Sequence, residues 1–566
     1  MSAAAKPPTT VRRTALALVV AVATATWLLP WNLEAIASLD GFAAAWRRFA
    51  EYLADFTAPD LSEPMLARCA VLAAETLAVA VLGTALGLLL AYPLALAAAR
   101  SVLVADDRPT GFAGTLRRLS TEAARLLLDV LRGVPDFLWA ILLATLTGIN
   151  AGTGVLALAL SIAGILGKVL SEQWDNVDPA RYEAVRATGA GKLTAFLYGV
   201  QPLAARAMQS FVLMRLECAV RNASVIGVVG GGGLGAALWD EYTDGSWSRV
   251  ATVLLALLLL TVSADVAANW VRRQLRVDPN HPRAKAATDR RSTARRRWTV
   301  GIGVAVVLAA AVAMLAQPLG RAVDELRRID GEFVRNFVTG LLVPDLAPDT
   351  LLAVLRHAAT PLAIGLLATL GGAVLAGLLA YPGSIAFQLE AHRFTGERLG
   401  GFERVRRTVW VIAARGTAVL LRGVPEVAWV VLLMVFWKQG VTPCVLAVTL
   451  HSAGVLHRVY AETLDNVPFD RLEKIGNACR SRVFLYGALP RALPDWRTYT
   501  FFQFEVNVRI GIALGIVGAG GLGERFKANL DFRELATASS FLWAMVLLTV
   551  AIDRTSRALQ LRRNRC

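Results

Sequence analysis

The sequence contains few residues that could hold a metal ion or form a redox centre. Among its 566 residues are five cysteines and five histidines. The cysteines show no paired spacing, and the histidines form no two-ligand helical motif that recurs along the chain. We therefore expect no metal site and interpret the cysteines as packing residues. These residues are Cys69, Cys218, Cys444, Cys479 and Cys566, and His281, His357, His392, His451 and His457.

The chain also lacks a nucleotide-binding motif. Gly189-Ala190-Gly191-Lys192 is followed by Leu193, where a phosphate-binding loop requires Ser or Thr, and Arg186 stands where its first Gly belongs. Residues 230–235 and 518–523 have the spacing of a dinucleotide fingerprint, but each follows a long apolar segment rather than a strand. We expect that this chain does not bind ATP itself and that neither half contains a soluble catalytic domain.

Apolar residues are present in large excess. They make up 55% of the chain, and the mean hydropathy is +0.51, more than a soluble domain needs. A bilayer is crossed by about 20 apolar residues in a helix, and twelve segments, six in each half, approach that length. We predict spans at about 14–31, 70–98, 121–147, 154–172, 203–229 and 249–271, and at 299–317, 358–385, 409–437, 442–461, 492–517 and 534–556.

The net charge of +16 could indicate a nucleic-acid partner, but the excess lies in short segments beside the predicted spans. Basic residues gather in residues 6–13, 272–297 and 554–565, whereas residues 34–63 are mainly acidic. The positive-inside rule therefore places both termini and the mid-chain segment in the cytoplasm. The first apolar segment resembles a signal peptide, but no clean small-residue cleavage site follows Trp31. We expect a multi-pass protein with no nucleic-acid partner.

An internal repeat organises the chain. An offset of 288 to 290 residues superimposes most of the second half on the first. Both copies have the same predicted orientation, so we expect parallel repeats about an axis along the membrane normal. We predict a first half at 1–271, a flexible basic linker at 272–298 and a second half at 299–566. The matching pairs include Ala91-Tyr92-Pro93 with Ala380-Tyr381-Pro382, Leu131-Arg132-Gly133-Val134-Pro135 with Leu421-Arg422-Gly423-Val424-Pro425, Asp175-Asn176-Val177 with Asp465-Asn466-Val467, and Phe196-Leu197-Tyr198-Gly199 with Phe484-Leu485-Tyr486-Gly487.

A polar segment, residues 181–189, lies between the fourth and fifth predicted spans, and Pro202 follows it. Asp178 and Pro179 can cap a short helix there, and Gly189 can end it. A degraded copy occupies residues 471–476. An ordinary solvated connection would explain one such loop, but its repetition between spans favours a helix that docks into a soluble partner.

With these elements the chain resembles the permease of a phosphonate-type ABC importer, especially over 120–240 and 410–530. The resemblance implies an all-α polytopic membrane protein of type I ABC importer permease architecture, with about 12 transmembrane helices in two six-helix halves. In that family the loop helix docks into a separate ATPase. The resemblance thus implies ATPase coupling by Glu183, Ala184 and Gly189, and in the second copy by Glu473 and Gly476. That copy is divergent, because Lys474 replaces the alanine and Asn477 stands where the first copy has Gly189.

The resemblance also implies the partners. The family works with two ATP-binding subunits, which carry ATP-Mg, and with a periplasmic binding protein that does much of the substrate selection. This chain would then be a transport subunit of the bacterial inner membrane rather than an enzyme, with no cofactor of its own. The implied substrate is a phosphonate or a related phosphorus oxyanion, with phosphate and phosphite left open.

The fifth predicted span of each half contains one charged pair. Glu217 and Arg221, like Glu505 and Arg509, are spaced four residues apart and share one helix face. Ionisable groups at that depth are costly unless they are paired or face water. One interpretation is a self-neutralising structural ion pair. The other is that the two arginines, one from each half, face a shared axis and help an anion through the pore.

The glycines that follow these spans permit sharp backbone turns and close helix approach. We interpret Gly230, Gly232, Gly235, Gly518, Gly520 and Gly523 as a gate or bend near the outer mouth, with plain helix termination as the alternative. The prolines Pro135 and Pro425 lie inside predicted spans and are expected to kink them.

Two other functions remain open from the sequence. A proton-coupled secondary transporter of a small anion also often has two six-span halves, and the two Glu/Arg pairs could serve as its proton relay. It would not need the repeated cytoplasmic helix. A membrane scaffold without transport activity is the third possibility.

Overall fold

The computed structural model describes residues 9–100, 112–275, 286–390, 399–467 and 479–563, and within these ranges it contains helices but no β-strand. The predicted all-α class is confirmed. The longer helices are α1 (Thr9–Leu28), α3 (Leu39–Thr57), α4 (Glu63–Ala98), α6 (Phe112–Gly133), α7 (Asp136–Thr147), α8 (Ala151–Asp175), α11 (Gln201–Ile226), α12 (Gly233–Thr243), α13 (Trp247–Leu275), α14 (Ala286–Arg328), α15 (Gly331–Leu342), α16 (Pro348–Gly383), α19 (Gly401–Gly423), α20 (Glu426–Trp437), α21 (Val441–Asp465), α23 (Leu489–Leu514), α24 (Leu522–Asp531) and α25 (Leu535–Arg563). The short ones are α2 (Glu34–Ala37), α9 (Glu183–Ala187), α10 (Lys192–Ala195), α17 (Ile385–Gln388) and α22 (Arg480–Val483).

The described chain forms two compact units. The first unit is Ala54–Arg335, and the second unit combines Met1–Leu53 with Asn336–Cys566. Relative to the predicted halves, each unit contains the first long helix of the other half. The permease halves 1–271 and 299–566 therefore remain a prediction from the sequence repeat, because the two units divide the chain at other residues. In the predicted linker, α13 continues to Leu275 and α14 begins at Ala286, while residues 276–285 lie outside the described ranges.

In the first unit, α14 packs against α4 and α8. The backbone of α14 comes close enough that a Cβ on Gly152 would lie 2.7 Å from the carbonyl oxygen of Pro318. Helices α4 and α8 also meet through glycine, since a Cβ on Gly83 would lie 2.7 Å from the Cβ of Leu158. Small residues permit such close helix approach in membranes. The core formed here includes the fully buried side chains of Leu158, Ile162 and Leu166.

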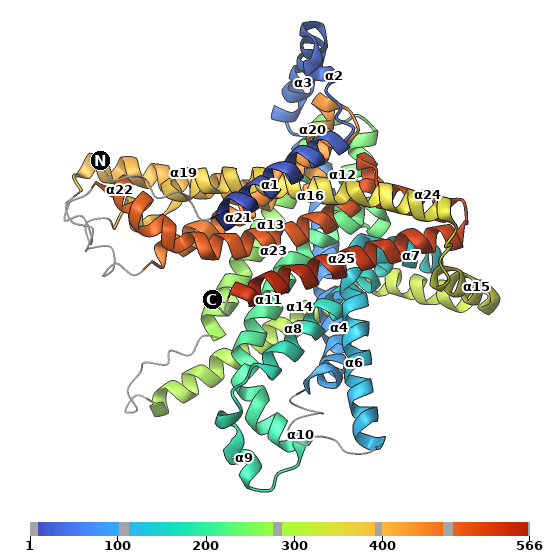
Figure 1. Cartoon of the computed structure of the whole chain (residues 1–566), viewed down its shortest axis with the longest axis vertical. Helices are drawn as coiled ribbons and strands as arrows, with labels where there is room; N and C mark the ends of the chain where they lie inside the picture. The colour runs from blue at the N-terminus through green and yellow to red at the C-terminus, as the bar shows by residue number, and fades with distance from the viewer. Residues whose placement is uncertain (1–8, 101–111, 276–285, 391–398, 468–478, 564–566) are drawn as a thin grey trace. The chain divides into compact units, whose positions relative to one another are not determined.

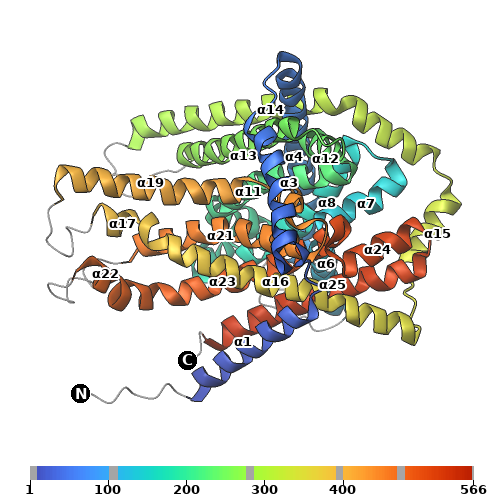
Figure 2. The same ribbon diagram turned by 90° about the horizontal axis from the view of Figure 1, so that it is seen from above.

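In the second unit, α16, α19, α21 and α23 run side by side in both views, and α1 lies along α16 (Figures 1 and 2). The backbones of α16 and α21 are again close, because a Cβ on Gly372 would lie 2.8 Å from the Cβ of Ser452. The expected proline kink is a full break in both units. Helix α6 ends at Gly133 and α7 begins after Pro135, and α20 is bent by 93° from α19 across Val424 and Pro425.

All twelve predicted spans lie on helices, but fewer of them form a single straight apolar helix. Among the described residues, eight helices are long and apolar enough to cross a membrane, and a ninth span results if the bent pair α19 and α20 is counted as one. Three features explain the smaller number, and the first is that the described apolar helix of the first predicted span, Leu16–Leu28, is shorter than a span. Charged residues such as Arg215, Glu217 and Arg221 interrupt the apolar sequence of α11, and the breaks before Asp136 and Glu426 divide two predicted spans into shorter helices.

Candidate coupling loop and membrane-embedded polar groups

The predicted coupling loop of the first unit connects α8 to α11. It consists of a 3-10 turn, η1 (Pro179–Arg181), followed by α9 and α10, which lie beyond the lower ends of α8 and α11 in Figure 1. The Asp178 carboxylate accepts a hydrogen bond from the amide of Ala180 at 3.1 Å, as expected for a cap before Pro179. Gly189 has φ +79°, a conformation that glycine adopts without strain. The predicted single helix is therefore divided into η1 and α9, and both end before Gly189.

The loop presents its predicted coupling residues to solvent. Glu183, Ala184 and Gly189 are exposed, whereas the preceding Tyr182 is buried, with 6% exposure. Tyr182 packs against Gly199, where a Cβ would lie 2.7 Å from the tyrosine Cβ. Burial, together with the nearby carboxylates of Asp175 and Asp178, raises the pKa of the Tyr182 phenol, so this side chain is neutral at physiological pH. One buried aromatic residue thus anchors an exposed polar helix.

An aromatic cluster supports this anchor. Trp174 is fully buried, and its ring makes edge-to-face contacts with Phe196 at 4.9 Å and Tyr92 at 5.6 Å between centroids. Each such pair contributes about 1 kcal/mol beyond its burial. Phe196 begins a π-helical turn, η2 (Phe196–Val200), that leads into α11. Neither Trp174 nor Tyr182 was predicted as a site residue, although both pack against the repeated Phe-Leu-Tyr-Gly element, at Phe196 and at Gly199.

In the second copy, the predicted coupling residues Glu473 and Gly476, and the divergent Lys474 and Asn477, lie outside the described residues. The base of that loop is described. Phe484 begins the corresponding π-helical turn, η7 (Phe484–Ala488), and its ring lies 4.8 Å from Tyr381. A fully buried Phe387 completes this cluster at 5.8 Å from Phe484. The position of Trp174 is taken by Leu464. Both copies therefore have a cluster of aromatic side chains beside the π-helical turn, but different residues form it.

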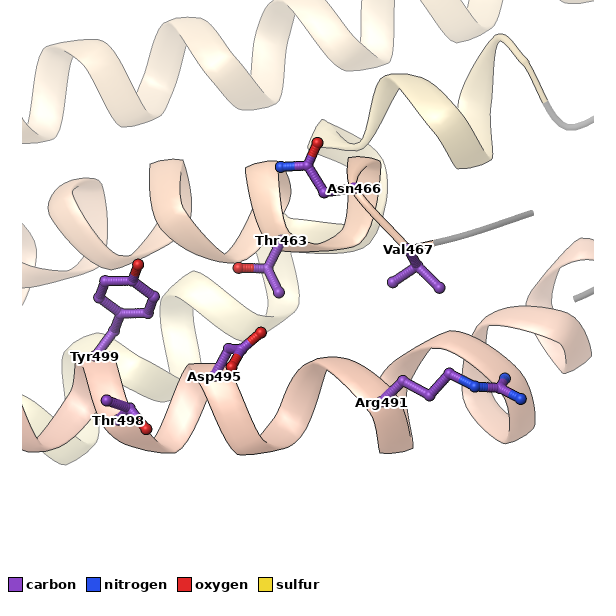
Figure 3. A pocket seen from close by; sticks show the side chains of 7 residues that line it. All are labelled: Thr463, Asn466, Val467, Arg491, Asp495, Thr498 and Tyr499. Carbon is purple, nitrogen blue, oxygen red and sulfur yellow. The ribbon is translucent and has the colours of Figure 1, made fainter. Parts of the chain in front are cut away.

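A cavity of about 670 Å³ lies between α21 and α23 in the second unit. Thr463 reaches it from α21, Asn466 and Val467 follow the end of that helix, and the remaining lining side chains come from α23 (Figure 3). The residues on α23 are Arg491, Asp495, Thr498 and Tyr499. At the positions of Arg491, Asp495 and Tyr499, the first copy has Leu203, Ala207 and Phe211. Three of the seven lining positions are therefore polar in the second copy and apolar in the first, and none of the lining residues was predicted as a site residue.

The two Glu/Arg pairs in α11 and α23 differ. In the second unit a guanidinium nitrogen of Arg509 donates to Glu505, so the expected pair within one helix is formed. In the first unit Glu217 lies instead 3.6 Å from Arg272 on α13. The Nε atom of Arg221 is buried and makes no hydrogen bond within the described residues. The Glu217 carboxylate thus lies beside a cation of a neighbouring helix, whereas the Glu505 carboxylate lies beside Arg509 of its own helix.

The glycine-rich segments adopt the same backbone path in both units. A π-helical turn ends each long helix, and positive φ values follow at Gly230 (+107°) and Gly232 (+75°), and at Gly518 (+113°) and Gly520 (+78°). A Cβ on Gly235 would collide with the carbonyl oxygen of Ser224. In the second unit Gly523 meets the carbonyl oxygen of Ile512 in the same way. The glycines thus both end the helix and reverse the chain sharply against it.

These turns are also hydrogen-bonded to neighbouring segments of the same unit. The amide of Leu234 donates to the hydroxyl of Thr76 on α4 at 2.9 Å, and Gln439 donates to the carbonyl oxygen of Val517 at 3.1 Å. Within the described ranges, no group of three or more His, Cys, Asp or Glu side chains is arranged to hold a metal ion.

The comparison with known proteins matches both copies of the repeat to one family. Residues 111–277 and 399–562 match the family "Binding-protein-dependent transport system inner membrane component". The chain is 29% identical over 504 residues to the phosphate-import permease protein PhnE of Mycolicibacterium smegmatis, a match that covers 88% of this chain and 86% of that protein.

Two shorter relatives match parts of the chain. The putative phosphite transport system permease protein HtxE of Stutzerimonas stutzeri is 35% identical over 145 residues, 25% of this chain and 55% of that protein. The putative cryptic phosphonate transport system permease protein PhnE2 of Escherichia coli is 42% identical over 109 residues, 19% of this chain and 88% of that protein. These matches support the permease interpretation and not the proton-coupled alternative.

The two matched segments make up more than half of the chain, contain both glycine-rich turns and include the position of each predicted coupling loop. The chain is a multi-pass membrane protein, and it belongs to the family of binding-protein-dependent transport system inner membrane components, with the family's domain present twice.

Proposed function

We propose that this chain supplies both transmembrane halves of an ATP-driven importer for a phosphorus oxyanion: a phosphonate, phosphite or phosphate. Two ATPase subunits on the cytoplasmic side and one periplasmic binding protein complete the transporter, and both termini lie in the cytoplasm. The observation that carries the proposal is the match of nearly the whole chain to a phosphate-import permease. Relatives named for phosphite and phosphonate transport support the same class of anion.

The exposed loop of the first unit is the proposed contact with the ATPase. Glu183 and Ala184 lie on a short helix that is anchored by Tyr182 and ended by Gly189. A helix that is exposed on one side and held by a buried aromatic side chain can enter a cleft on a partner without losing its own support. Its movement then reaches α8 and α11, to which the loop is joined directly.

The test is uptake into proteoliposomes that contain the full chain with the ATPase and binding protein encoded beside it. We expect ATP-dependent uptake of phosphate, phosphite or methylphosphonate. Leucine at Gly189 is strained by its positive φ and projects from the proposed docking surface, so Gly189→Leu should abolish uptake while the chain remains folded. No uptake of any of the three anions by the complete wild-type transporter would refute the proposed substrate class.

A matched control comes from Gly245, which has φ +72° and, like Gly189, has no atom near its missing side chain. Gly245→Leu introduces the same backbone strain in the connection between α12 and α13. It should leave uptake close to normal. Equal losses in the two variants would mean that strain, rather than the docking surface, explains the result, and would remove Gly189 from the proposed contact.

Arg221 and Arg509 are the proposed cationic groups on the anion's path. Among the described residues, the buried Nε of Arg221 makes no hydrogen bond, which leaves it able to bind an anion. Arg509 is engaged with Glu505, so its replacement is tested together with Glu505→Gln to avoid a buried unpaired carboxylate. Normal anion uptake by the Arg221→Gln, Glu505→Gln, Arg509→Gln variant would exclude this role.

A further inference from the structure

An arginine of the first unit joins the ends of two helices to a third helix beside the coupling loop. Arg125 lies on α6, and its Nη2 donates to a carboxylate oxygen of Asp175, the last residue of α8, at 2.8 Å. Its Nε donates at 2.8 Å to the carbonyl oxygen of Ala98, the last residue of α4. A helix leaves its final carbonyl groups without internal partners. One guanidinium therefore binds the C-terminal ends of two helices to a third.

The second unit repeats this arrangement atom for atom. Arg415 on α19 donates from Nη2 to Asp465, the last residue of α21, at 2.7 Å, and from Nε to the carbonyl oxygen of Gly383, the last residue of α16, at 2.8 Å. The Asp465 carboxylate has two additional hydrogen bonds, which it accepts from the Ser384 hydroxyl at 2.6 Å and the Ala386 amide at 3.1 Å. Arginine and aspartate are 50 residues apart in both units.

We propose that the Arg125–Asp175 and Arg415–Asp465 clamps are positioning residues for energy coupling: each makes the ends of the neighbouring helices move with the coupling loop. Asp175 stands directly before the loop that carries Glu183, and Asp465 precedes the corresponding loop of the second copy. Without the clamp, a displacement of the loop would reach only α8 and α11, to which the loop is joined. With it, the same displacement is shared by α4 and α6. This inference rests on the proposed function.

The chemistry of the clamp requires arginine. A planar guanidinium presents donors in two fixed directions, whereas the lysine ammonium is a point charge on a flexible stem. The clamps are partly exposed, with 29% and 22% exposure for the Arg125 and Asp175 side chains and 37% and 23% for those of Arg415 and Asp465. Ion pairs at such sites contribute little to overall stability. Their duplicated geometry is therefore better explained by alignment of the helix ends than by stability.

The test measures phosphate uptake per ATP hydrolysed in the complete transporter reconstituted in proteoliposomes. Arg125→Lys and Arg415→Lys together should lower this ratio about fivefold, the lower end of typical coupling free energies between sites. The Tm and the amount of ATPase subunit that co-purifies should not change. Arg100→Lys is the matched control, because Arg100 forms an ion pair with Glu122 at 2.9 Å that is largely exposed and joins fewer helices.

The outcomes separate the two proposals. If the wild-type transporter takes up none of the tested anions, the proposed substrate class fails, and ATPase stimulation by the loaded binding protein then replaces uptake as the coupling readout. If the wild type is active and the double lysine variant keeps its ratio, the clamp has no positioning role. A loss of ATPase subunits or a large fall in Tm would show a structural role and would overturn the inference as well.

Discussion

The two units have nearly the same backbone breaks but different polar interiors. In the first unit, Lys168 forms an ion pair with Asp129 in a mostly buried site. At the same positions the second unit has Arg458, which pairs with Glu462 at a more exposed site, and the apolar Val419. The second unit contains instead a buried network of neutral groups from Thr369, Ser452, Gln503 and Asn507. Backbone geometry has been kept between the copies, while the polar chemistry inside them has diverged.

A second pair of positions makes the same distinction. An acidic residue follows the helix break in both units, Asp136 after Pro135 and Glu426 after Pro425. Asp136 accepts hydrogen bonds from the neutral side chains of Ser161 and Asn222. Glu426 lies 3.0 Å from His451, which occupies the position of Ser161. A carboxylate at the start of a helix is stabilised by the helix dipole in either case, so the carboxylate is common to both units and only its partner differs.

The largest expected effect tests the difference between the interiors. Lys168→Met removes one cation from the mostly buried carboxylate of Asp129, and we expect a loss of about 4 kcal/mol in the free energy of unfolding. Arg458→Met in the second unit removes a more exposed pair and should cost about 0.5 kcal/mol. Reversible unfolding in mixed detergent, or thermal unfolding followed by size-exclusion chromatography, measures both.

The control for this prediction introduces residues of the second copy into the first. Asp129→Val, which installs the residue found at that position in the second unit, should restore most of the stability when it is combined with Lys168→Met. Equal losses in Lys168→Met and Arg458→Met would contradict the comparison, and so would a double variant as unstable as the single one.

The next effect tests what the units share. Alanine at Gly235 or at Gly523 places a Cβ against a backbone carbonyl oxygen, of Ser224 or of Ile512, and no rotamer change relieves that collision. We expect each substitution to destabilise the protein by about 3 kcal/mol, and by similar amounts in the two units. Gly245→Ala is the control, because it has open space and only the positive φ to oppose it, at about 1 kcal/mol. If alanine were tolerated at one of these two glycines and not at the other, the two turns would not be equivalent.

The sequence predicted the shared features better than the divergent ones. The repeated Arg-Gly-Val-Pro and glycine-rich elements led to the correct positions of the helix breaks and turns, because glycine and proline act on the local backbone. The pairing of Glu217 with Arg272 and the packing of α14 on the first unit were missed. Spacing along one helix identifies its own neighbours, whereas these partners come from separate helices. Arg125 and Asp175 are 50 residues apart, so the clamp had no local signal either.

The smallest expected effect also tests a shared feature, the polar turn before α4 and before α16. In the first unit, hydrogen bonds from Ser62 lower the pKa of Asp60. In the second, the hydroxyl of Thr350 and the amide of Ala347 lower the pKa of Asp345. A carboxyl group whose pKa is lowered by folding stabilises the fold above its ordinary pKa of about 4, and that stabilisation is lost as the pH falls through the lower, folded value.

Both turns should therefore loosen together in acid. Hydrogen exchange at the amides of Ser62 and Ala347, followed from pH 7 to pH 3 and corrected for the intrinsic exchange rate, should show protection falling in both below pH 4. Asp60→Asn should remove the pH dependence at Ser62 and leave that at Ala347 intact, and Asp345→Asn should do the reverse. Asp60 also lies 3.4 Å from Arg249. If this exposed ion pair dominated, raised salt would abolish protection at Ser62 alone, and the two turns would no longer be equivalent.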